Sequence, residues 1–104
     1  HDVILVYDND TIVGSGSYKL YDNETVEIKR IYIDEPYRGL GLGHKLMLCL
    51  ETDAREAGFQ YAILETGAPL VAATCLYVKR GYTIIPNYGQ YKDMPESVCM
   101  KKTL

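Results

Sequence analysis

The stretch YRGLGLGHK, residues 37–45, places glycine at every second position, at Gly39, Gly41 and Gly43. Apolar residues at helical spacing follow in residues 42–57, so the glycines lie where a loop enters a helix. Glycine permits a positive φ and a close approach of the backbone to a ligand, although it costs conformational entropy relative to alanine. The stretch therefore predicts a loop whose backbone closes around a bound group at a helix start.

Two common phosphate-binding loops fit this stretch poorly. A Walker loop requires Gly-Lys-Ser/Thr after its glycine run, whereas Gly43 is followed by His44, Lys45 and Leu46. A dinucleotide fingerprint requires G-x-G-x-x-G directly after a strand, but His44 occupies the place of the third glycine. Glu65 does lie about twenty residues further on, where that fingerprint has an acidic residue, so nucleotide-dependent oxidoreduction stays a remote alternative.

A third pattern, R-x-x-G-x-G, is matched by Arg38, Gly41 and Gly43. The first turn of a helix presents unpaired N–H groups and the positive end of the helix dipole to an anion. Arg38 can add charge-assisted hydrogen bonds to that anion or can order the loop. This pattern predicts a pyrophosphate cradle.

The rest of the chain alternates short extended runs with two helical segments. Gly58 and Gly81 are placed to end helices in the left-handed conformation, and Pro69 suits the first turn of the second helix. A helix between two strands predicts a parallel pair, and hence a mixed sheet. We therefore predict a single α+β domain, residues 1–104, with helices packed on a mixed sheet. The expected strands are residues 3–7, 11–20, 26–33, 61–65, 82–85 and 97–101, and the expected helices are residues 42–57 and 70–80.

The third strand carries an irregularity. In VEIKRIYI, residues 26–33, the alternation of apolar and polar residues slips by one at Lys29 and Arg30. A β-bulge adds one residue, restores the inward face after the slip and bends the strand away from its neighbour. Backbone groups of residues 31–33 would then lack a strand partner. A strand buried on both faces, or a plain edge irregularity, explains the pattern equally well.

Composition and charge exclude several classes of partner. There are 11 Lys and Arg against 14 Asp and Glu, a formal net charge of −3, so nucleic acid is not an expected partner. Cys49, Cys75 and Cys99 are odd in number and dispersed, which predicts buried free thiols and no metal site. No apolar run is long enough to span a bilayer and no signal pattern opens the chain, so we expect a cytoplasmic protein without a membrane partner.

Two further sets of motifs, together with the R-x-x-G-x-G pattern, resemble those of a known family. Residues 73–82 read Ala-x-x-Leu-Tyr-x-x-x-Gly-Tyr, and the tail contains IPNYGQY and SVCMKK. Together with R-x-x-G-x-G, these motifs resemble the GNAT-type superfamily of acetyl-CoA-dependent N-acetyltransferases, especially its small bacterial members, from Val3 to Lys101. Members usually begin with a strand and one or two helices that wall the acceptor pocket. The resemblance therefore implies an N-terminally incomplete GNAT-like sheet, an antiparallel meander followed by a parallel β-α-β crossover.

The resemblance also implies where acetyl-CoA binds. In the family, one strand splays from its parallel neighbour and its backbone groups bind the pantetheine arm, while the loop and helix start hold the pyrophosphate. Leu70 stands where many members place an Asn or Gln that holds the pantetheine arm, so weaker CoA binding is expected. The implied cofactor-binding residues are Ile31, Tyr32, Ile33, Arg38, Gly39, Gly41, Leu42, Gly43 and His44.

Two residues are implied as catalytic. Tyr77 matches the family's tyrosine that serves as general acid near the CoA sulfur, and a phenol with a pKa of about 10 holds its proton at neutral pH. Glu27 matches a strand position where several members place a glutamate base, used directly or through a water. Glu65 is the rival base. A packing role for Tyr77 and a structural role for Glu27 stay open as alternatives.

The expected function is transfer of an acetyl group from acetyl-CoA, as co-substrate, to a primary amine of a small-molecule or amino-acid-like acceptor. The reaction is a direct attack by the amine, with Tyr77 as general acid. The alternative is a catalytically weak acyl-CoA-binding module, or a fragment that needs a partner chain to complete its acceptor site. A homodimer therefore stays open as a partner.

Overall fold

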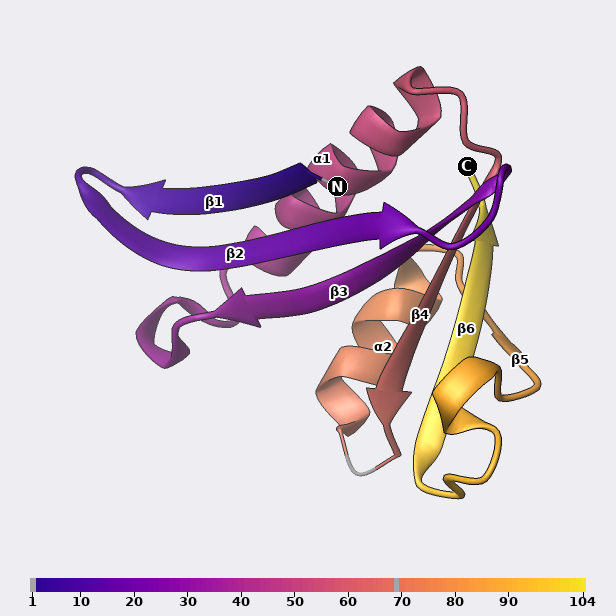
Figure 1. Cartoon of the computed structure of the whole chain (residues 1–104). Coiled ribbons are helices and arrows are strands. Elements are labelled where there is room, and N and C mark those ends of the chain that lie inside the picture. Colours follow the sequence, from indigo (N-terminus) through magenta and orange to yellow (C-terminus); the bar gives the residue numbers. More distant parts are fainter. Residues whose placement is uncertain (1, 69) are drawn as a thin grey trace.

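Six strands and two α-helices follow each other in an order close to the expected one (Figure 1). The computed structural model describes residues 2–68 and 70–104. The predicted helix 70–80 is observed as α2, and Pro69, predicted to open it, lies outside the described residues. The elements are β1 (Asp2–Asp8), β2 (Thr11–Leu20), β3 (Thr25–Ile33), α1 (Leu42–Glu56), β4 (Tyr61–Gly67), α2 (Val71–Lys79), β5 (Thr83–Ile85) and β6 (Ser97–Thr103), with short 3₁₀ turns η1 (Glu35–Tyr37) and η2 (Gly89–Tyr91).

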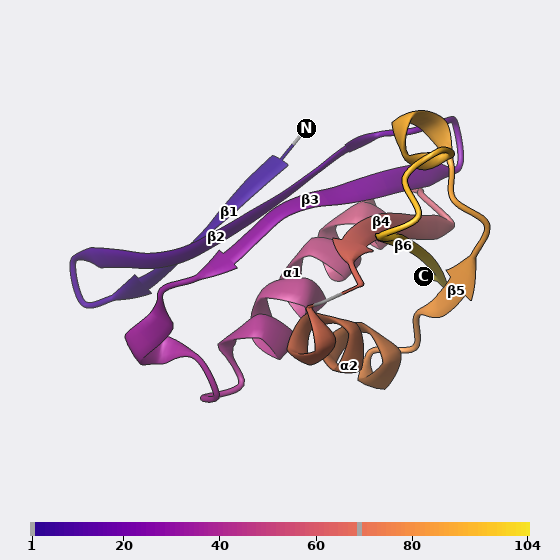
Figure 2. The same cartoon turned by 90° about the horizontal axis from the view of Figure 1, so that it is seen from below.

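The strands form one mixed sheet in the order β1-β2-β3-β4-β6-β5. Among the strands of the described residues, only the β3–β4 pair is parallel, as the helical crossover predicted, and the other neighbours are antiparallel. Both helices lie on the same face of the sheet, which we call the helical face (Figure 2). The opposite face, the open face, carries no α-helix among the described residues and is covered at one end by the 3₁₀ turn η2. The predicted α+β class with a mixed sheet is confirmed.

The predicted bulge lies in β3 at Arg30, whose φ is +59°. Ser15 pairs with Tyr32 and Ser17 with Lys29, so β3 carries one more residue than β2 across this step. The extra residue returns the isoleucines that follow it to the helical face, where they pack against the core. On its other side β3 pairs with β4 only from Thr25 to Glu27. Beyond Glu27 the two strands part, as the sequence predicted.

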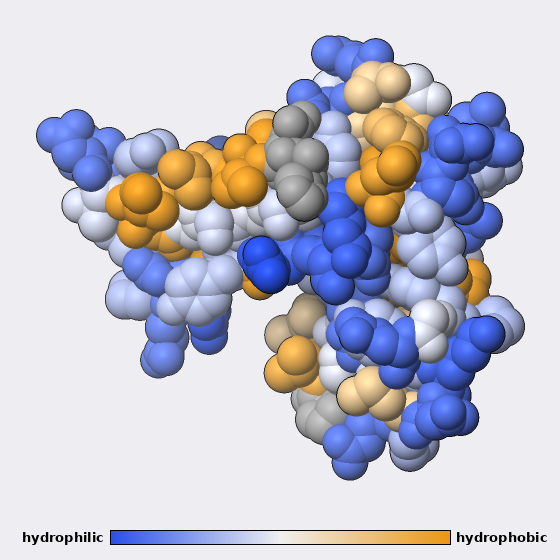
Figure 3. All heavy atoms as spheres, viewed as in Figure 1, coloured by the Kyte–Doolittle hydropathy of each residue, from blue (hydrophilic) through white to orange (hydrophobic). Residues whose placement is uncertain are grey.

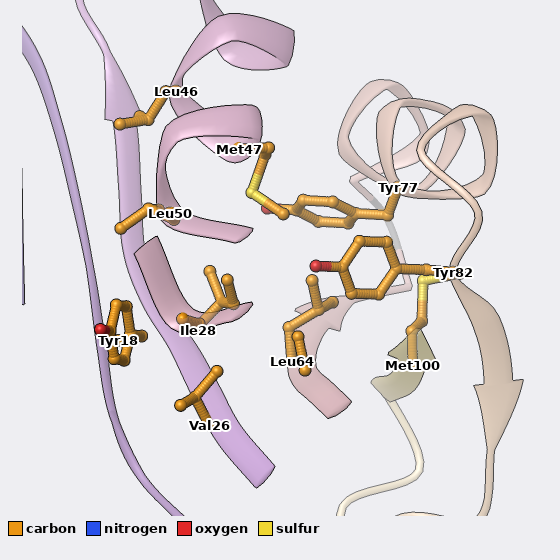
Figure 4. Packing of buried hydrophobic residues seen from close by; sticks show 12 residues of the cluster. Tyr18, Val26, Ile28, Leu46, Met47, Leu50, Leu64, Tyr77, Tyr82 and Met100 are labelled. Atoms are coloured by element: carbon orange, nitrogen blue, oxygen red, sulfur yellow. The ribbon is translucent and has the colours of Figure 1, made fainter. Parts of the chain in front are cut away.

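The core lies between the sheet and the two helices (Figure 4). Strands β2, β3 and β4 contribute Tyr18, Val26, Ile28 and Leu64, and β6 contributes Met100. Helix α1 covers them with four side chains, Leu46, Met47, Leu50 and Ala54, which are all buried.

Two predictions about side chains in this layer are wrong. Cys49 and Cys75 are exposed, and only Cys99 is buried. With 3.6 residues per turn, Cys49 points roughly 140–160° around α1 from Met47 and Ala54, so an apolar side chain at near-helical spacing did not imply burial. The sequence also gave no sign that Glu51, on the same helix, would be buried.

Glu51 is buried because three partners satisfy its carboxylate. Its Oε1 accepts hydrogen bonds from Arg80 and, at 2.7 Å, from Lys102 Nζ, and its Oε2 accepts one at 3.0 Å from the hydroxyl of Tyr82. These partners come from the end of α2, from β6 and from the residue before β5. The cluster therefore ties α1 to the far half of the sheet.

Part of the open face is apolar. The exposed side chains of Val3, Leu5 and Ile12 lie on the β1–β2 hairpin, where Figure 3 shows a band of hydrophobic surface. No helix within the described ranges is long and apolar enough to cross a membrane.

Candidate active site

The glycine loop leads into the start of α1. Gly39 and Gly41 have φ values of +79° and +80°, in the left-handed region that glycine favours. A Cβ added at either position would have no other atom within 4 Å, so each backbone faces open space. Gly41 is the N-cap residue, no side chain caps the helix, and Lys45 is the first residue to donate to a carbonyl four residues back. The amides of the first turn therefore have no partner within the helix, as an anion cradle requires.

Gly43 is needed for a different reason. It lies inside α1 with an ordinary φ, and an added Cβ would come within 3.1 Å of the Leu76 side chain on α2. Its absent side chain therefore allows α1 and α2 to approach closely. Leu42 and His44, its neighbours in the first turn, are half-buried.

Arg38 orders the loop. Its Nε donates to the carbonyl of Ile33 at 2.8 Å, and its guanidinium lies 5.7 Å from the ring centre of Tyr32. The neighbouring Tyr37 donates its hydroxyl to Asp8 at 2.7 Å. The loop is thus tied both to the end of β3 and to the β1–β2 hairpin.

The second half of β3 borders the gap that opens toward β4. Tyr32 and Ile33 pair with β2 on one side, and β3 has no register partner in β4 after Glu27. Ile31 and Ile33 are half-buried against the core, whereas Tyr32 is exposed on the other face. The three residues predicted to bind the pantetheine arm therefore lie along a strand edge next to the start of α1.

Tyr77 lies on the helical face. It projects from α2 into the core, is 7% exposed, and packs edge-to-face on Tyr82 with ring centres 5.9 Å apart. Figure 4 shows both phenol rings directed from the α2 side toward α1 and β3, with Met47 beside Tyr77. Burial raises the pKa of the Tyr77 phenol above its usual value of 10. Among the described residues, none accepts or donates a hydrogen bond at this hydroxyl.

Glu27 lies on the open face. Val26 and Ile28, its neighbours in β3, point into the core, so the alternation of the strand turns Glu27 the other way. Its side chain is nevertheless buried, because Tyr88, just before η2, covers it and donates a 2.8 Å hydrogen bond to its Oε2. Tyr77 and Glu27 therefore lie on opposite faces of the sheet, with Glu27 at the last paired position before β3 and β4 part.

The rival base Glu65 also lies on the open face. Ile63 is the β4 partner of Glu27, and Glu65 follows it two residues later on the same face. Its Oε2 accepts a 2.8 Å hydrogen bond from Ser97, and the side chain is half-buried. Glu65 therefore lies on the part of β4 that no longer pairs with β3.

The sequence did not single out the residues that surround Glu27. The register pairs Lys19 with Glu27 and Ser17 with Lys29, which brings both lysines onto the open face beside the carboxylate. With Tyr88 they line a pocket of about 260 Å³. Polar alternation in residues 19, 27 and 29 was visible in the sequence, but the register that joins the strands was not. No group of three or more His, Cys, Asp and Glu side chains suited to a metal ion occurs in residues 2–68 and 70–104.

Comparison with known proteins places this geometry in a family. Residues 1–82 match the family model of the acetyltransferase (GNAT) family. An "IAA acetyltransferase" of Azospirillum brasilense is 34% identical over 96 residues, which are 90% of this chain and 62% of that protein. The chain thus spans less than two thirds of this curated relative.

Solved structures share the fold. A Klebsiella pneumoniae protein described as an acyl-CoA N-acyltransferase superposes with a TM-score of 0.85 at 40% identity, over 89% of this chain and 64% of its own. A GNAT family acetyltransferase of Elizabethkingia anophelis, solved with acetyl-CoA bound, superposes with a TM-score of 0.86 at 23% identity, over 98% of this chain and 75% of its own. This chain belongs to the GNAT family of acetyltransferases.

Proposed function

We propose that this chain, residues 1–104, is a partial GNAT domain of an N-acetyltransferase that moves an acetyl group from acetyl-CoA to a primary amine. The acceptor is a small-molecule or amino-acid-like amine. The observation that carries the proposal is the joint placement of an uncapped helix start and a freed strand edge, because CoA needs a pyrophosphate site and an extended-arm site side by side.

The residues present fit CoA. The backbone of Gly39 and Gly41 and the first-turn amides of α1, those of Leu42, Gly43 and His44, are suited to hold the pyrophosphate. The edge of residues 31–33 is suited to pair with the pantetheine arm as an added strand would. The GNAT family acetyltransferase of Elizabethkingia anophelis holds acetyl-CoA in the same fold, which supports this assignment.

The base and the acid of the reaction are assigned to residues on opposite faces of the sheet, Glu27 and Tyr77. When bound, acetyl-CoA supplies an activated thioester. Glu27 accepts the proton that the attacking amine loses, directly or through a water, and Tyr77 gives its phenolic proton to the departing sulfur. Burial favours this role of Tyr77, because a raised pKa keeps its proton in place at neutral pH.

Calorimetric titration with acetyl-CoA tests the proposal, with Gly41→Ala compared with Gly58→Ala. Both glycines have positive φ and open surroundings, and they lie at opposite ends of α1. Each variant should lose ~1–2 kcal/mol of stability to the same left-handed strain. Only Gly41→Ala should weaken acetyl-CoA binding, by about tenfold or more, because it disturbs amides that bind a charged group.

Thiol release across a panel of amines then separates an enzyme from a module that only binds acyl-CoA. Binding of acetyl-CoA without release of thiol would favour the module. Absence of binding at low salt, or equal weakening by both glycine variants, would contradict the assignment of the cradle.

A further inference from the structure

The pocket beside Glu27 has features that acetyl-CoA binding does not use. It lies on the open face, on the other side of the sheet from α1 and α2, and has a volume of about 260 Å³. It is therefore separate from the helix start and borders the fork between β3 and β4 at Glu27. This volume lies just below the roughly 300–1,000 Å³ of typical small-molecule sites, so the pocket suits only a small ligand.

The two oxygens of the Glu27 carboxylate have different partners in the pocket. Tyr88 occupies Oε2, so Oε1 is the oxygen left for an incoming amine. The ammonium groups of Lys19 and Lys29 lie 3.7 and 3.8 Å from this Oε1.

Those two distances exceed the roughly 2.7–2.9 Å of a charge-assisted hydrogen bond. Both lysines are therefore ion-paired with the carboxylate at long range, but neither is hydrogen-bonded to it. Each ammonium has three donors, and no described residue accepts a hydrogen bond from either one. The lysine side chains are 48% and 28% exposed, so their donors are within reach of a molecule that enters the pocket.

The charge of the pocket is opposite to that of the chain. Two lysines and one glutamate give the pocket a formal charge of +1, whereas the whole sequence carries −3. A purely cationic amine would meet two like charges beside the one oxygen that can receive it. An amine that carries a carboxylate on the adjacent carbon would place its negative group against the lysines and its nitrogen against Glu27.

Three tyrosines form much of the remaining wall. Tyr88 packs edge-to-face against Tyr21 on one side, with ring centres 5.4 Å apart, and against Tyr91 on the other, at 5.6 Å. All three rings line the pocket. Aromatic rings in contact with each other give a fixed apolar surface, which suits an apolar or aromatic side chain.

We propose that this pocket binds an amine with a neighbouring carboxylate, that is an amino acid with an apolar side chain, and that Lys19 and Lys29 select for the carboxylate. The proposal rests on the proposed function and adds the acceptor class and two specificity-determining residues. It assigns the open face to the acceptor, whereas the donor is assigned to the start of α1 and the gap.

Direct binding tests the proposal without any need for turnover. Phenylalanine and phenethylamine differ only by the carboxylate, and each can be titrated into the full chain at low ionic strength, followed by amide chemical shifts. Phenylalanine should bind about tenfold more tightly, since two ammonium donors meet its carboxylate. Lys19→Met and Lys29→Met should each lower phenylalanine affinity about three- to tenfold and leave phenethylamine affinity unchanged.

Lys101→Met is the matched control, because Lys101 lies over the Tyr61 ring on the same face but lines a different hollow. It should leave the phenylalanine preference intact. Equal affinity for both ligands, no binding of either, or a loss of preference in the Lys101 variant as large as in the others would overturn the proposal.

Thiol release from acetyl-CoA with phenylalanine is measured separately. No release alongside a clear binding preference would refute the proposed function and not the amino-acid site. Release with phenethylamine that matches or exceeds release with phenylalanine would refute the selectivity and not the transferase function.

Discussion

Two buried tyrosines in contact, Tyr77 and Tyr82, should respond in opposite ways when their hydroxyls are removed. Their rings pack edge-to-face and both are buried. The Tyr82 hydroxyl donates to Glu51 at 3.0 Å, whereas no described residue bonds the Tyr77 hydroxyl. A change to phenylalanine therefore removes a hydrogen bond to a charged group at one position and none at the other.

The magnitudes follow from those contacts. Tyr82→Phe should lower the free energy of unfolding by ~1.5–3 kcal/mol, the usual worth of a hydrogen bond to a charged group. For a chain of this length that shifts the melting temperature by roughly 10 °C. Tyr77→Phe should change the free energy of unfolding by less than about 1 kcal/mol, because its hydroxyl has no partner to lose.

Activity should show the reverse order. If Tyr77 donates the proton to the departing sulfur, Tyr77→Phe should lower kcat about 10²- to 10⁴-fold, the range for general acid catalysis. Tyr82→Phe, measured well below its melting temperature, should keep kcat within about threefold of the wild-type value, since its hydroxyl is engaged by Glu51.

Urea unfolding and thiol release, measured over a range of pH on both variants, check these expectations. Full turnover of Tyr77→Phe at every pH would refute the general-acid role. A loss of turnover in Tyr82→Phe equal to that in Tyr77→Phe, without a loss of stability, would show that the assignment of the two rings is reversed.

Two further predictions concern stability. Glu51→Ala should lower the free energy of unfolding by about 3–5 kcal/mol, because it leaves the largely buried charges of Arg80 and Lys102 without their carboxylate. Urea unfolding measures this loss, and Glu56→Ala, at an exposed position of the same helix, is the control. Stability should also fall above pH 10. Burial raises the pKa of Tyr77 and Tyr82, so both states are protonated below pH 10 and only the unfolded chain ionises just above it. The free energy of unfolding should then drop by about 1.4 kcal/mol per pH unit for each tyrosine, and unfolding curves that stay unchanged between pH 9 and 11 would contradict this.

Local signals predicted the parts of the fold that depend on neighbouring residues. The strand limits of β2, the left-handed helix ends at Gly58 and Gly81 and the bulge at Arg30 all follow from residue type and alternation within a few positions. The parallel pairing of β3 with β4 followed from the helix between them. Each of these features is set by backbone sterics or strand alternation, which the sequence displays directly.

The pairing of segments that lie far apart in the chain could not be predicted from local signals. Nothing in residues 83–103 indicated that β6 would lie between β4 and β5. The lysines beside Glu27 and the tyrosine that covers it come from three segments, and Tyr88 lies 61 residues away from Glu27 along the chain. The buried carboxylate of Glu51 likewise depends on partners 29 and 51 residues away. Pairings of this kind are set by packing of the whole sheet, so they appear only with the structure.

The bulge at Arg30 connects the sequence to both halves of the proposed site. Without the bulge, with Arg30 as a regular strand residue, the alternation of β3 would turn Ile31 and Ile33 toward the open face and Tyr32 toward α1, which would empty part of the core. With it, the isoleucines stay on the core and β3 bends away from β4, which continues to Gly67 paired only with β6. A non-glycine residue with φ of +59° costs about 1–2 kcal/mol, and the side chain of Arg30 is exposed, so packing of that side chain does not offset the strain. The strain is instead offset by the core contacts of the isoleucines. The same bend places Glu27 where β3 and β4 part, beside both the proposed donor site and the proposed acceptor pocket.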